Sequence, residues 1–278
     1  MSKTPEDWIG KTESCVDALD TSLASRIAAM LARPAPQEGD ALCPLWHWAF
    51  FQIPAPPSGT GPDGHIAPGD FLPKSEGNTR MWAGGRVEFL KPLQIGQRAE
   101  RQSRIKSVTE KTGRSGKLLF VTVEHHYRQN GELCLSEEQD IVYKAPAAPK
   151  LFLDKPVAEA EWSEQVIPSP LLLFRYSAVT FNGHRIHYDR PYTTEVEGYP
   201  DLVVHGPMIA TLMVQAFLDA NPGRIPVRLS YRGLRPLTVD KPFNVEGQVS
   251  GDGKAILWAA NEDGPAHEAE IEFKEKSE

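Results

Sequence analysis

The segment GLRPLTVDK, residues 233–241, repeats an earlier segment of the same chain, FLKPLQIGQ at 89–97. Two further pairs follow in the same order: GKLLFV (116–121) with GKAILW (253–258), and EQDIVYK (138–144) with EAEIEFK (268–274). The separation shrinks from 144 residues in the first pair to 130 in the last, as shorter hairpins in the second copy would produce. Three matches in one order indicate an internal duplication.

The segments around these repeats have the composition of strands. LLFVTVEHHY (118–127) is rich in β-branched and aromatic residues, and EQDIVYK alternates apolar with polar side chains. Turn signals separate the runs at TGRSGK (112–117), QNGE (129–132) and SGDGK (250–254). Each copy also has one helix candidate, amphipathic at 21–33 and apolar on nearly every side at 206–221. The second of these should be deeply buried.

Each half therefore reads as one helix followed by about four antiparallel strands. A long helix wrapped by a curled antiparallel sheet is a hot-dog fold, so the chain is predicted to be an α+β double hot-dog. Joining the two sheets edge to edge leaves fewer open edges. We predict an N-terminal half at 1–146, a linker at 147–164 that overlaps the Pro/Ala-rich segment 145–162, and a C-terminal half at 165–278.

Composition narrows the class of protein. The formal net charge of −7 argues against a general nucleic-acid or anionic-membrane binder, although a local basic patch could hold a phosphorylated ligand. The three cysteines are scattered and fit neither a disulfide framework nor a zinc site, which favours a cytoplasmic location. The N-terminus lacks the apolar core of a signal peptide, and no run reaches the roughly 18 apolar residues of a membrane span.

Residues whose side chains or backbone could take part in catalysis cluster in FNGHRIHYD (181–189) and VVHGP (203–207). Residues 171–181 read as a strand, and Asn182-Gly183 favours a tight turn with positive φ. This turn would present His184, Arg185 and His187 together. Gly206 then opens the buried helix, where its N–H is free for a ligand oxygen and the helix N-terminus favours negative charge.

These groups suit the addition of water to an α,β-unsaturated thioester. The reaction needs a base for the water and hydrogen-bond donors for the thioester oxygen as it becomes enolate-like. A histidine near its unperturbed pKa of about 6.5 can take the proton at neutral pH. The Gly206 N–H can polarise the carbonyl, and the reaction requires no cofactor.

FNGHRIHYD followed by VVHGP resembles the MaoC-like, (R)-specific type-2 enoyl-CoA hydratases. In this resemblance Asn182 occupies the position of the family's aspartate, His187 that of its histidine and Gly206 that of its oxyanion glycine. An amide cannot act as a base, so the resemblance implies that Asn182 orients the water and His187 moves the proton.

The first half resembles a narrower branch of that family, the double-hot-dog dehydratases. The resemblance is carried by PLWHWAFF (44–51), GDFLP (69–73) and RMWAGGRVEFLKPL (80–93). The branch includes mitochondrial type-2 hydroxyacyl-thioester dehydratases and bacterial mesaconyl-CoA or itaconyl-CoA hydratases. It implies an acyl-CoA substrate, a homodimer, and catalytic residues in the second half alone.

Several roles stay open at this point. Arg185 either lies on the surface or meets a substrate carboxylate, and His184 and Tyr176 are candidates for substrate contact. Candidates for the CoA phosphates are Arg80, Arg86, Lys91, Arg232 and Arg235. Trp46, Trp48 and Trp82 line an acyl pocket or fill the core, with the core favoured. His187 could itself be structural, as His205, His125 and His126 are expected to be. A metal bound by His184, His187 and His205 is not expected.

We therefore predict reversible hydration of a short branched dicarboxylic 2-enoyl-CoA, such as mesaconyl- or itaconyl-CoA, to citramalyl-CoA. The alternative is a 3-hydroxyacyl-thioester dehydratase of fatty-acid synthesis. Two less favoured alternatives are an acyl-CoA thioesterase and a non-catalytic acyl-CoA binder.

Overall fold

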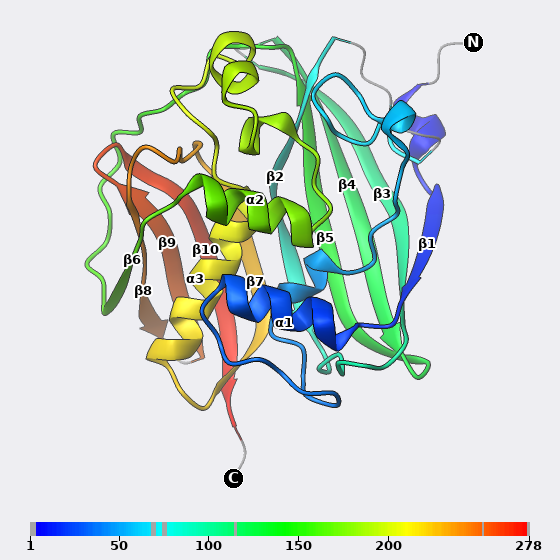
Figure 1. Ribbon diagram of the computed structural model, residues 1–278, viewed down its shortest axis with the longest axis vertical. Coiled ribbons are helices and arrows are strands. Elements are labelled where there is room, and N and C mark those ends of the chain that lie inside the picture. The colour runs from blue at the N-terminus through cyan, green and yellow to red at the C-terminus, as the bar shows by residue number, and fades with distance from the viewer. Residues whose placement is uncertain (1–3, 68–70, 74–76, 114–115, 252, 277–278) are drawn as a thin grey trace.

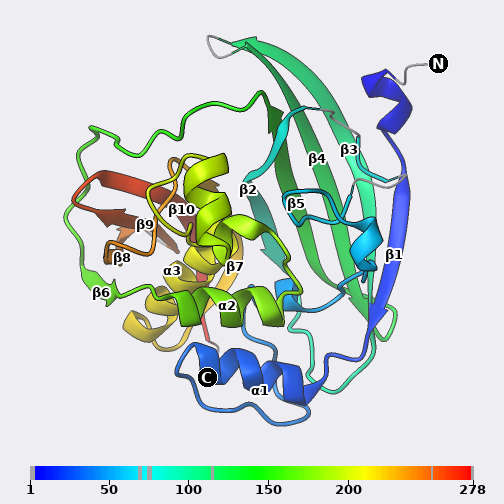
Figure 2. The ribbon, with the colours of Figure 1, turned by 45° about the horizontal axis from the view of Figure 1, so that its top comes forward.

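One antiparallel sheet carries every named strand of the chain that the structure describes. The computed structural model describes residues 4–67, 71–73, 77–113, 116–251 and 253–276. The predicted turns at 112–117 and 250–254 and the segment GDFLP therefore lie partly outside the described residues. The sheet has ten strands in the order β1-β3-β4-β5-β2-β7-β10-β9-β8-β6, and Figure 2 shows it curling around the helices.

The strand order reads the same from both edges when each strand is matched with its counterpart in the other half. The first half supplies β1 Thr12–Asp17, β2 Thr79–Phe89, β3 Ala99–Gly113, β4 Gly116–Gln129 and β5 Glu132–Lys144. The second half supplies β6 Trp162–Val166, β7 Arg224–Gly233, β8 Phe243–Gly251, β9 Lys254–Asn261 and β10 Gly264–Glu275. β2 and β7 pair at the centre and join the halves edge to edge. This arrangement confirms the predicted double hot-dog.

The duplicated segment holds the same place in both halves. Gln94 forms an isolated antiparallel bridge with Ala41, and Thr238, its counterpart in the repeat, forms one with Val203. The sequence repeat is thus a structural repeat. Between β5 and β6 the chain has no helix or strand, but the exact limits of the two halves stay a prediction.

Residues 171–181 do not form the predicted strand, because helix α2 covers Pro170–Val179. The Ser169 side chain caps this helix by accepting a hydrogen bond from the Leu172 N–H at 3.2 Å. Pro170 is suited to the first helical turn. The periodicity of an unbroken apolar run cannot distinguish a strand from a buried helix. Here the Ser169-Pro170 pair at the start of the run is the signal that indicates a helix.

The helix predicted at 21–33 is present as α1 Thr21–Met30, but the second half has two α-helices rather than the one expected. α1 and α2 each follow the edge strand of their own half and lie side by side (Figure 1). α3 Gly206–Ala220 is the long buried helix of the second half, as predicted. At the matching point of the first half there is only a short 3₁₀ helix, Trp46–Ala49. No long apolar helix therefore covers the inner face of the first-half sheet in the described chain.

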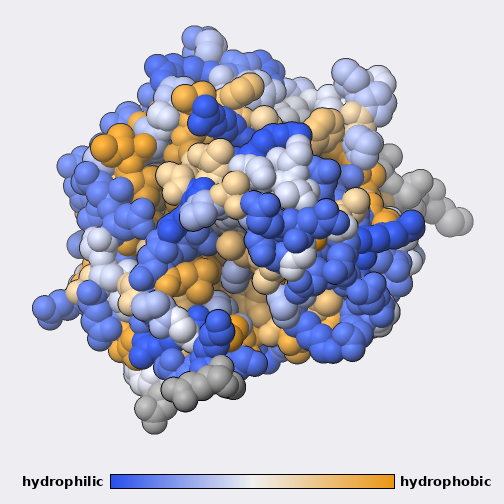
Figure 3. All heavy atoms as spheres, turned by 60° about the horizontal axis from the view of Figure 1, so that its bottom comes forward, coloured by the Kyte–Doolittle hydropathy of each residue, from blue (hydrophilic) through white to orange (hydrophobic). Residues whose placement is uncertain are grey.

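Apolar side chains remain on the surface beside hydrophilic ones. Figure 3 shows hydrophilic residues over most of one face, with apolar residues in separate patches. On α2, Leu171 and Phe174 are largely exposed, which is ordinary for single surface residues. Among the described residues, every helix is too short or too polar to cross a bilayer.

Candidate active site

His187 ends a 3₁₀ turn, Arg185–His187, that follows α2. Its side chain is 6% exposed. The imidazole stacks on the ring of His205, with the centroids 3.5 Å apart and the planes 18° from parallel. His205 is the residue immediately before α3. The structure thus brings the His187 ring to the start of the buried helix, where Gly206 is the first residue.

The hydrogen bonds of His187 fix the position of its proton. Nδ1 lies 2.7 Å from the carbonyl oxygen of Val203. Because a carbonyl oxygen only accepts, Nδ1 carries the hydrogen and donates it. The lone pair then lies on Nε2, which forms no hydrogen bond with any residue of the described chain. Nε2 is therefore available to accept a proton from a water molecule.

The ordinary pKa that we predicted for His187 is wrong. Burial, together with the charge of His184, lowers the pKa of His187 to about 3, although the Val203 carbonyl opposes the shift. The ring is therefore neutral throughout the physiological pH range. Neutrality is the state that a proton acceptor needs before the reaction begins.

The turn that carries Asn182 differs from the predicted one. The left-handed residue is Phe181, with φ of 50°, rather than Asn182 or Gly183. Asn182 is half-buried, and its Oδ1 accepts a hydrogen bond from the His184 N–H at 2.9 Å, as asparagine does in an Asx turn. The side-chain Nδ2 is left to donate to a ligand, and Asn182 lines a pocket between the two halves.

A loop of the first half, residues 57–66, packs against this turn. The Asp63 carbonyl accepts a hydrogen bond from the Arg185 N–H at 2.8 Å. A Cβ added to Gly183 would lie 2.6 Å from the Gly64 carbonyl oxygen, and a Cβ on Gly64 would lie closer still to Gly183. The two glycines are required because the backbones approach each other this closely.

Replacing Gly183 with alanine should displace this loop and lower kcat/KM for enoyl-CoA hydration at least about tenfold, because misplacement of catalytic groups by about 1 Å is costly. Initial rates check this result. Gly59→Ala is the matched control in the same loop, since its Cβ would meet no atom closer than 3.4 Å. Equal rates for Gly183→Ala and the wild type would show that the loop contact does not position the site.

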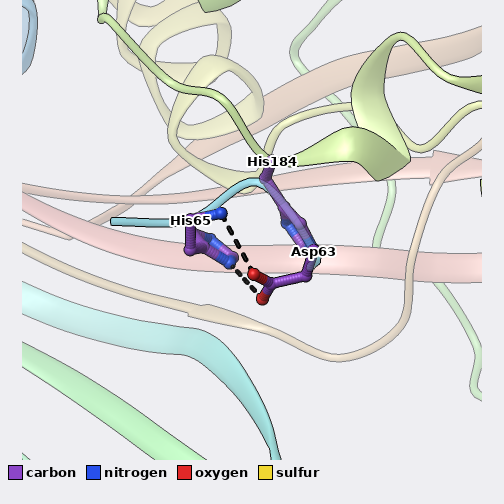
Figure 4. A group of neighbouring side chains, drawn as sticks. All are labelled: Asp63, His65 and His184. Carbon is purple, nitrogen blue, oxygen red and sulfur yellow. Dashed lines mark hydrogen bonds and ion pairs between the residues drawn. The ribbon is translucent and has the colours of Figure 1, made fainter. Parts of the chain in front are cut away.

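Sequence reasoning missed Asp63 and His65, which the loop brings to His184 (Figure 4). The Asp63 carboxylate accepts hydrogen bonds from His65 Nδ1 at 2.8 Å and from the His65 N–H at 3.1 Å. The rings of His65 and His184 lie 3.9 Å apart with planes tilted by 32°. Burial lowers the pKa of His184 to about 3. The Asp-x-His spacing was a usable signal, because aspartate often bonds the backbone two residues on.

Asp63, His65 and His184 also form a group whose potential metal-ligating atoms lie within 4.8 Å of one another. Both Asp63 oxygens already accept hydrogen bonds from His65, and the His65 and His184 rings lie against each other. The three histidines considered from the sequence, His184, His187 and His205, do not share a site either. His187 Nδ1 donates to the Val203 carbonyl, and His205 Nε2 lies 2.8 Å from Ser177 Oγ. The Asp63, His65 and His184 side chains thus fit a hydrogen-bonded cluster better than a metal site.

Removal of divalent metals should leave the hydration rate unchanged. The measurement compares initial rates before and after dialysis against EDTA, with zinc added back in a third sample. A rate that falls on dialysis and returns with zinc would contradict the metal-free account.

The pocket beside Asn182 has a volume of about 350 Å³ and lies between the two halves. Of the residues predicted to contact substrate, Arg80 and Tyr176 line it. Trp48 and Trp82 line it as well, although the sequence favoured the core for them, while Trp46 is buried in the core. The pocket also has a lining residue that the sequence did not single out, Arg101.

Three other arginines named from the sequence are engaged away from this pocket. A bulge between Trp82 and Gly84 turns Arg86 to the other face of β2, where it pairs with Glu138 and Asp140 at 2.9 and 2.8 Å. Arg185 pairs with Asp189 at 2.7 Å and lies over the Tyr192 ring. Arg235 is buried and donates to the Gly264 carbonyl, which is a structural role.

The remaining basic and histidine candidates also have partners in the fold. Lys91 pairs with Glu132 at 2.6 Å, and Arg232 pairs with Glu268. His125 is buried with Nδ1 at 2.8 Å from Ser103 Oγ, while His126, on the opposite face of β4, is half-buried.

Comparison with known proteins places the chain among thioester hydro-lyases. The family model described as hydroxyacyl-thioester dehydratase type 2 matches residues 45–239. Mesaconyl-C(4)-CoA hydratase of Chloroflexus aurantiacus is 44% identical over 92% of this chain and 93% of its own length. The mitochondrial hydroxyacyl-thioester dehydratase type 2 of Schizosaccharomyces pombe is 28% identical over 78% of this chain and 80% of its own.

Solved structures share the fold at low sequence identity. A MaoC-like dehydratase from Phytophthora capsici aligns with a TM-score of 0.73 at 12% identity, covering 98% of each chain. A second MaoC-like dehydratase aligns with a TM-score of 0.76 at 13% identity, covering 99% of this chain and 100% of that one.

Proposed function

This chain belongs to the hydroxyacyl-thioester dehydratase type 2 family, and we propose that it adds water reversibly to the double bond of a 2-enoyl-CoA. It is a hydro-lyase. The proposed substrate is a short branched dicarboxylic thioester, mesaconyl- or itaconyl-CoA, and the product is citramalyl-CoA. The 44% identical relative named for mesaconyl-C(4)-CoA supports this choice.

The observation that carries the proposal is the neutral His187 ring stacked at the start of α3. In hydration, Nε2 of His187 takes a proton from water, and the water oxygen bonds to C3 of the enoyl group. The electrons of the double bond move toward the thioester oxygen, which the Gly206 N–H stabilises. C2 then takes the proton back from the imidazolium, so that one water is added and the enzyme is regenerated.

The low pKa of His187 is compatible with this role. The ring is charged only between the two proton transfers. At that moment the enolate oxygen carries negative charge nearby, which raises the affinity of the ring for its proton. The Asn182 amide, left with Nδ2 to donate, is proposed to orient the water or the substrate.

A panel of CoA thioesters tests the substrate choice. Loss of absorbance at the enoyl-thioester band is followed with mesaconyl-, itaconyl- and crotonyl-CoA and with longer linear enoyl-CoAs. The proposal expects the highest kcat/KM with a short dicarboxylic thioester. A preference for long linear chains would favour a dehydratase of fatty-acid synthesis, and release of free CoA would favour a thioesterase.

Three further properties belong to this proposal. The reaction as drawn requires no cofactor beyond the CoA of the substrate, and no nucleic acid or membrane partner is proposed. We also propose a cytoplasmic homodimer. Size-exclusion chromatography with light scattering would check the dimer.

A further inference from the structure

The pocket between the halves has an unbalanced set of charged side chains. Arg80 and Arg101 both line it, whereas no aspartate or glutamate does so among the described residues. Other lining groups donate hydrogen bonds or are apolar, among them Gln139, Tyr127 and Trp48. Two guanidinium groups without an acid in the lining suit a ligand that carries its own negative charge.

Arg101 lacks a close carboxylate partner among the described residues, and the Tyr127 hydroxyl is its other polar neighbour. The Arg101 side chain is 16% exposed, and its nearest carboxylate, on Glu13, lies 3.6 Å away. This distance is well beyond the roughly 2.8 Å of a charge-assisted hydrogen bond. The Nε atom is buried and has no hydrogen-bond partner among the described residues. An unsatisfied buried donor costs about 1–3 kcal/mol, so an absent acceptor is the natural explanation.

Arg80 also lacks a carboxylate partner. It forms no ion pair with any residue of the described chain, and its guanidinium lies close enough to the Tyr143 hydroxyl to act on that group. Its positive charge is close enough to contribute to the lowered pKa of His65, for which burial is the main cause. Arg80 therefore lies near the loop that packs against the Asn182 turn.

A buried carboxylate beside this lining, that of Glu137, already has hydrogen-bond partners. Glu137 is buried and accepts hydrogen bonds from His47 at 3.1 Å, Trp48 at 2.7 Å, Tyr127 at 2.8 Å and Gln139 at 2.9 Å. Glu137 is not among the residues that line the pocket, and it forms no ion pair with Arg101. The network holds the pocket wall rigid and leaves the guanidinium groups to a ligand.

We propose that Arg101, assisted by Arg80, binds the free carboxylate at the far end of a short dicarboxylic acyl group. This inference rests on the proposed function, in which the acyl chain enters the pocket beside Asn182. A pocket of about 350 Å³ is large enough for a short acyl group but too small for the whole of CoA. The same guanidinium groups could instead meet a CoA phosphate, and the experiment separates these two anions.

The test measures binding rather than turnover. Succinyl-CoA and butyryl-CoA have four-carbon acyl groups, and neither has a double bond to hydrate, so only the terminal carboxylate separates them. Isothermal titration should show that Arg101→Gln weakens succinyl-CoA binding about 10- to 100-fold, the range for one charged hydrogen-bonded contact. Butyryl-CoA binding should change less than about twofold.

Matched variants complete the test. Arg104→Gln removes an exposed arginine from the same strand and should change neither affinity. Arg101→Lys keeps the charge without the two-pronged geometry and should recover part of the succinyl-CoA affinity. Equal weakening of both ligands by Arg101→Gln would assign the arginine to CoA phosphates and overturn the proposal, as would unchanged affinity for both. Neither result depends on whether the enzyme hydrates enoyl-CoAs.

Discussion

The free energy of unfolding should fall by roughly 5 kcal/mol when the pH is lowered from 7 to 5.5. Four buried histidines produce this effect. Burial, the largest cause in each case, lowers the pKa of His125 and His267 to about 4 and that of His184 and His187 to about 3. Each histidine returns to a pKa of about 6.5 when the chain unfolds.

The sign follows from where the protons bind. Between pH 6.5 and about 4 the unfolded chain takes up protons on these side chains, and the folded chain does not. Each group therefore destabilises the fold by about 1.4 kcal/mol per pH unit once the pH is well below 6.5. Burial also lowers the pKa of His65 and His205, so both add to the loss in the same direction.

Urea titrations at pH 7 and 5.5, followed by circular dichroism, measure the loss. His125→Asn removes one buried imidazole away from the candidate site, and the loss in that variant should be smaller by about 1 kcal/mol. His126→Asn replaces a less buried neighbour and is the control. Equal stability of the wild-type protein at the two pH values would show that these histidines are not held neutral.

Much of the fold could be predicted from the sequence, because both copies of the duplicated unit keep recognisable local patterns. The paired segments at 89–97 and 233–241, the turns between strands and the apolar helix at 206–220 all lie in windows that periodicity can interpret. The helix α2 was missed because its apolar run is short and continuous, and only the Ser169-Pro170 start indicates a helix.

Some residues of the candidate site could be predicted from the sequence and others could not. His187 and Gly206 belong to local motifs in one half, so the sequence could name them. Asp63, His65 and Arg101 come from the other half, and only the joining of β2 to β7 brings that half to the site. The lowered pKa of His187 was equally out of reach, because it depends on burial among side chains that are distant in the sequence.

Replacing His187 with alanine should lower kcat/KM for hydration by about 10²- to 10⁴-fold, the usual contribution of one proton-transferring side chain. The effect should appear mainly in kcat, because the ring acts on the water rather than on the CoA portion of the substrate. The Gly206 N–H stays in place in this variant and continues to polarise the thioester, which accounts for a remaining slow rate.

The structural role of His187 must be separated from this chemical one. The ring also stacks on His205 and donates to the Val203 carbonyl, so its loss should cost stability. His187→Asn is the comparison variant, because its amide can still donate a hydrogen bond but cannot carry a proton between atoms. Both variants should be compared with the wild type at pH 8, where the buried histidines of the wild type are neutral in both the folded and the unfolded chain.

The most direct test of His187 as the proton carrier is the initial rate of mesaconyl-CoA hydration by the wild type and by His187→Ala. The rate is read at the enoyl-thioester absorbance band at pH 8, on samples whose thermal unfolding shows an intact fold. The variant should hydrate mesaconyl-CoA at a rate at least 100-fold below that of the wild type. Comparable rates from two folded proteins would contradict this prediction and assign the proton transfer to another residue.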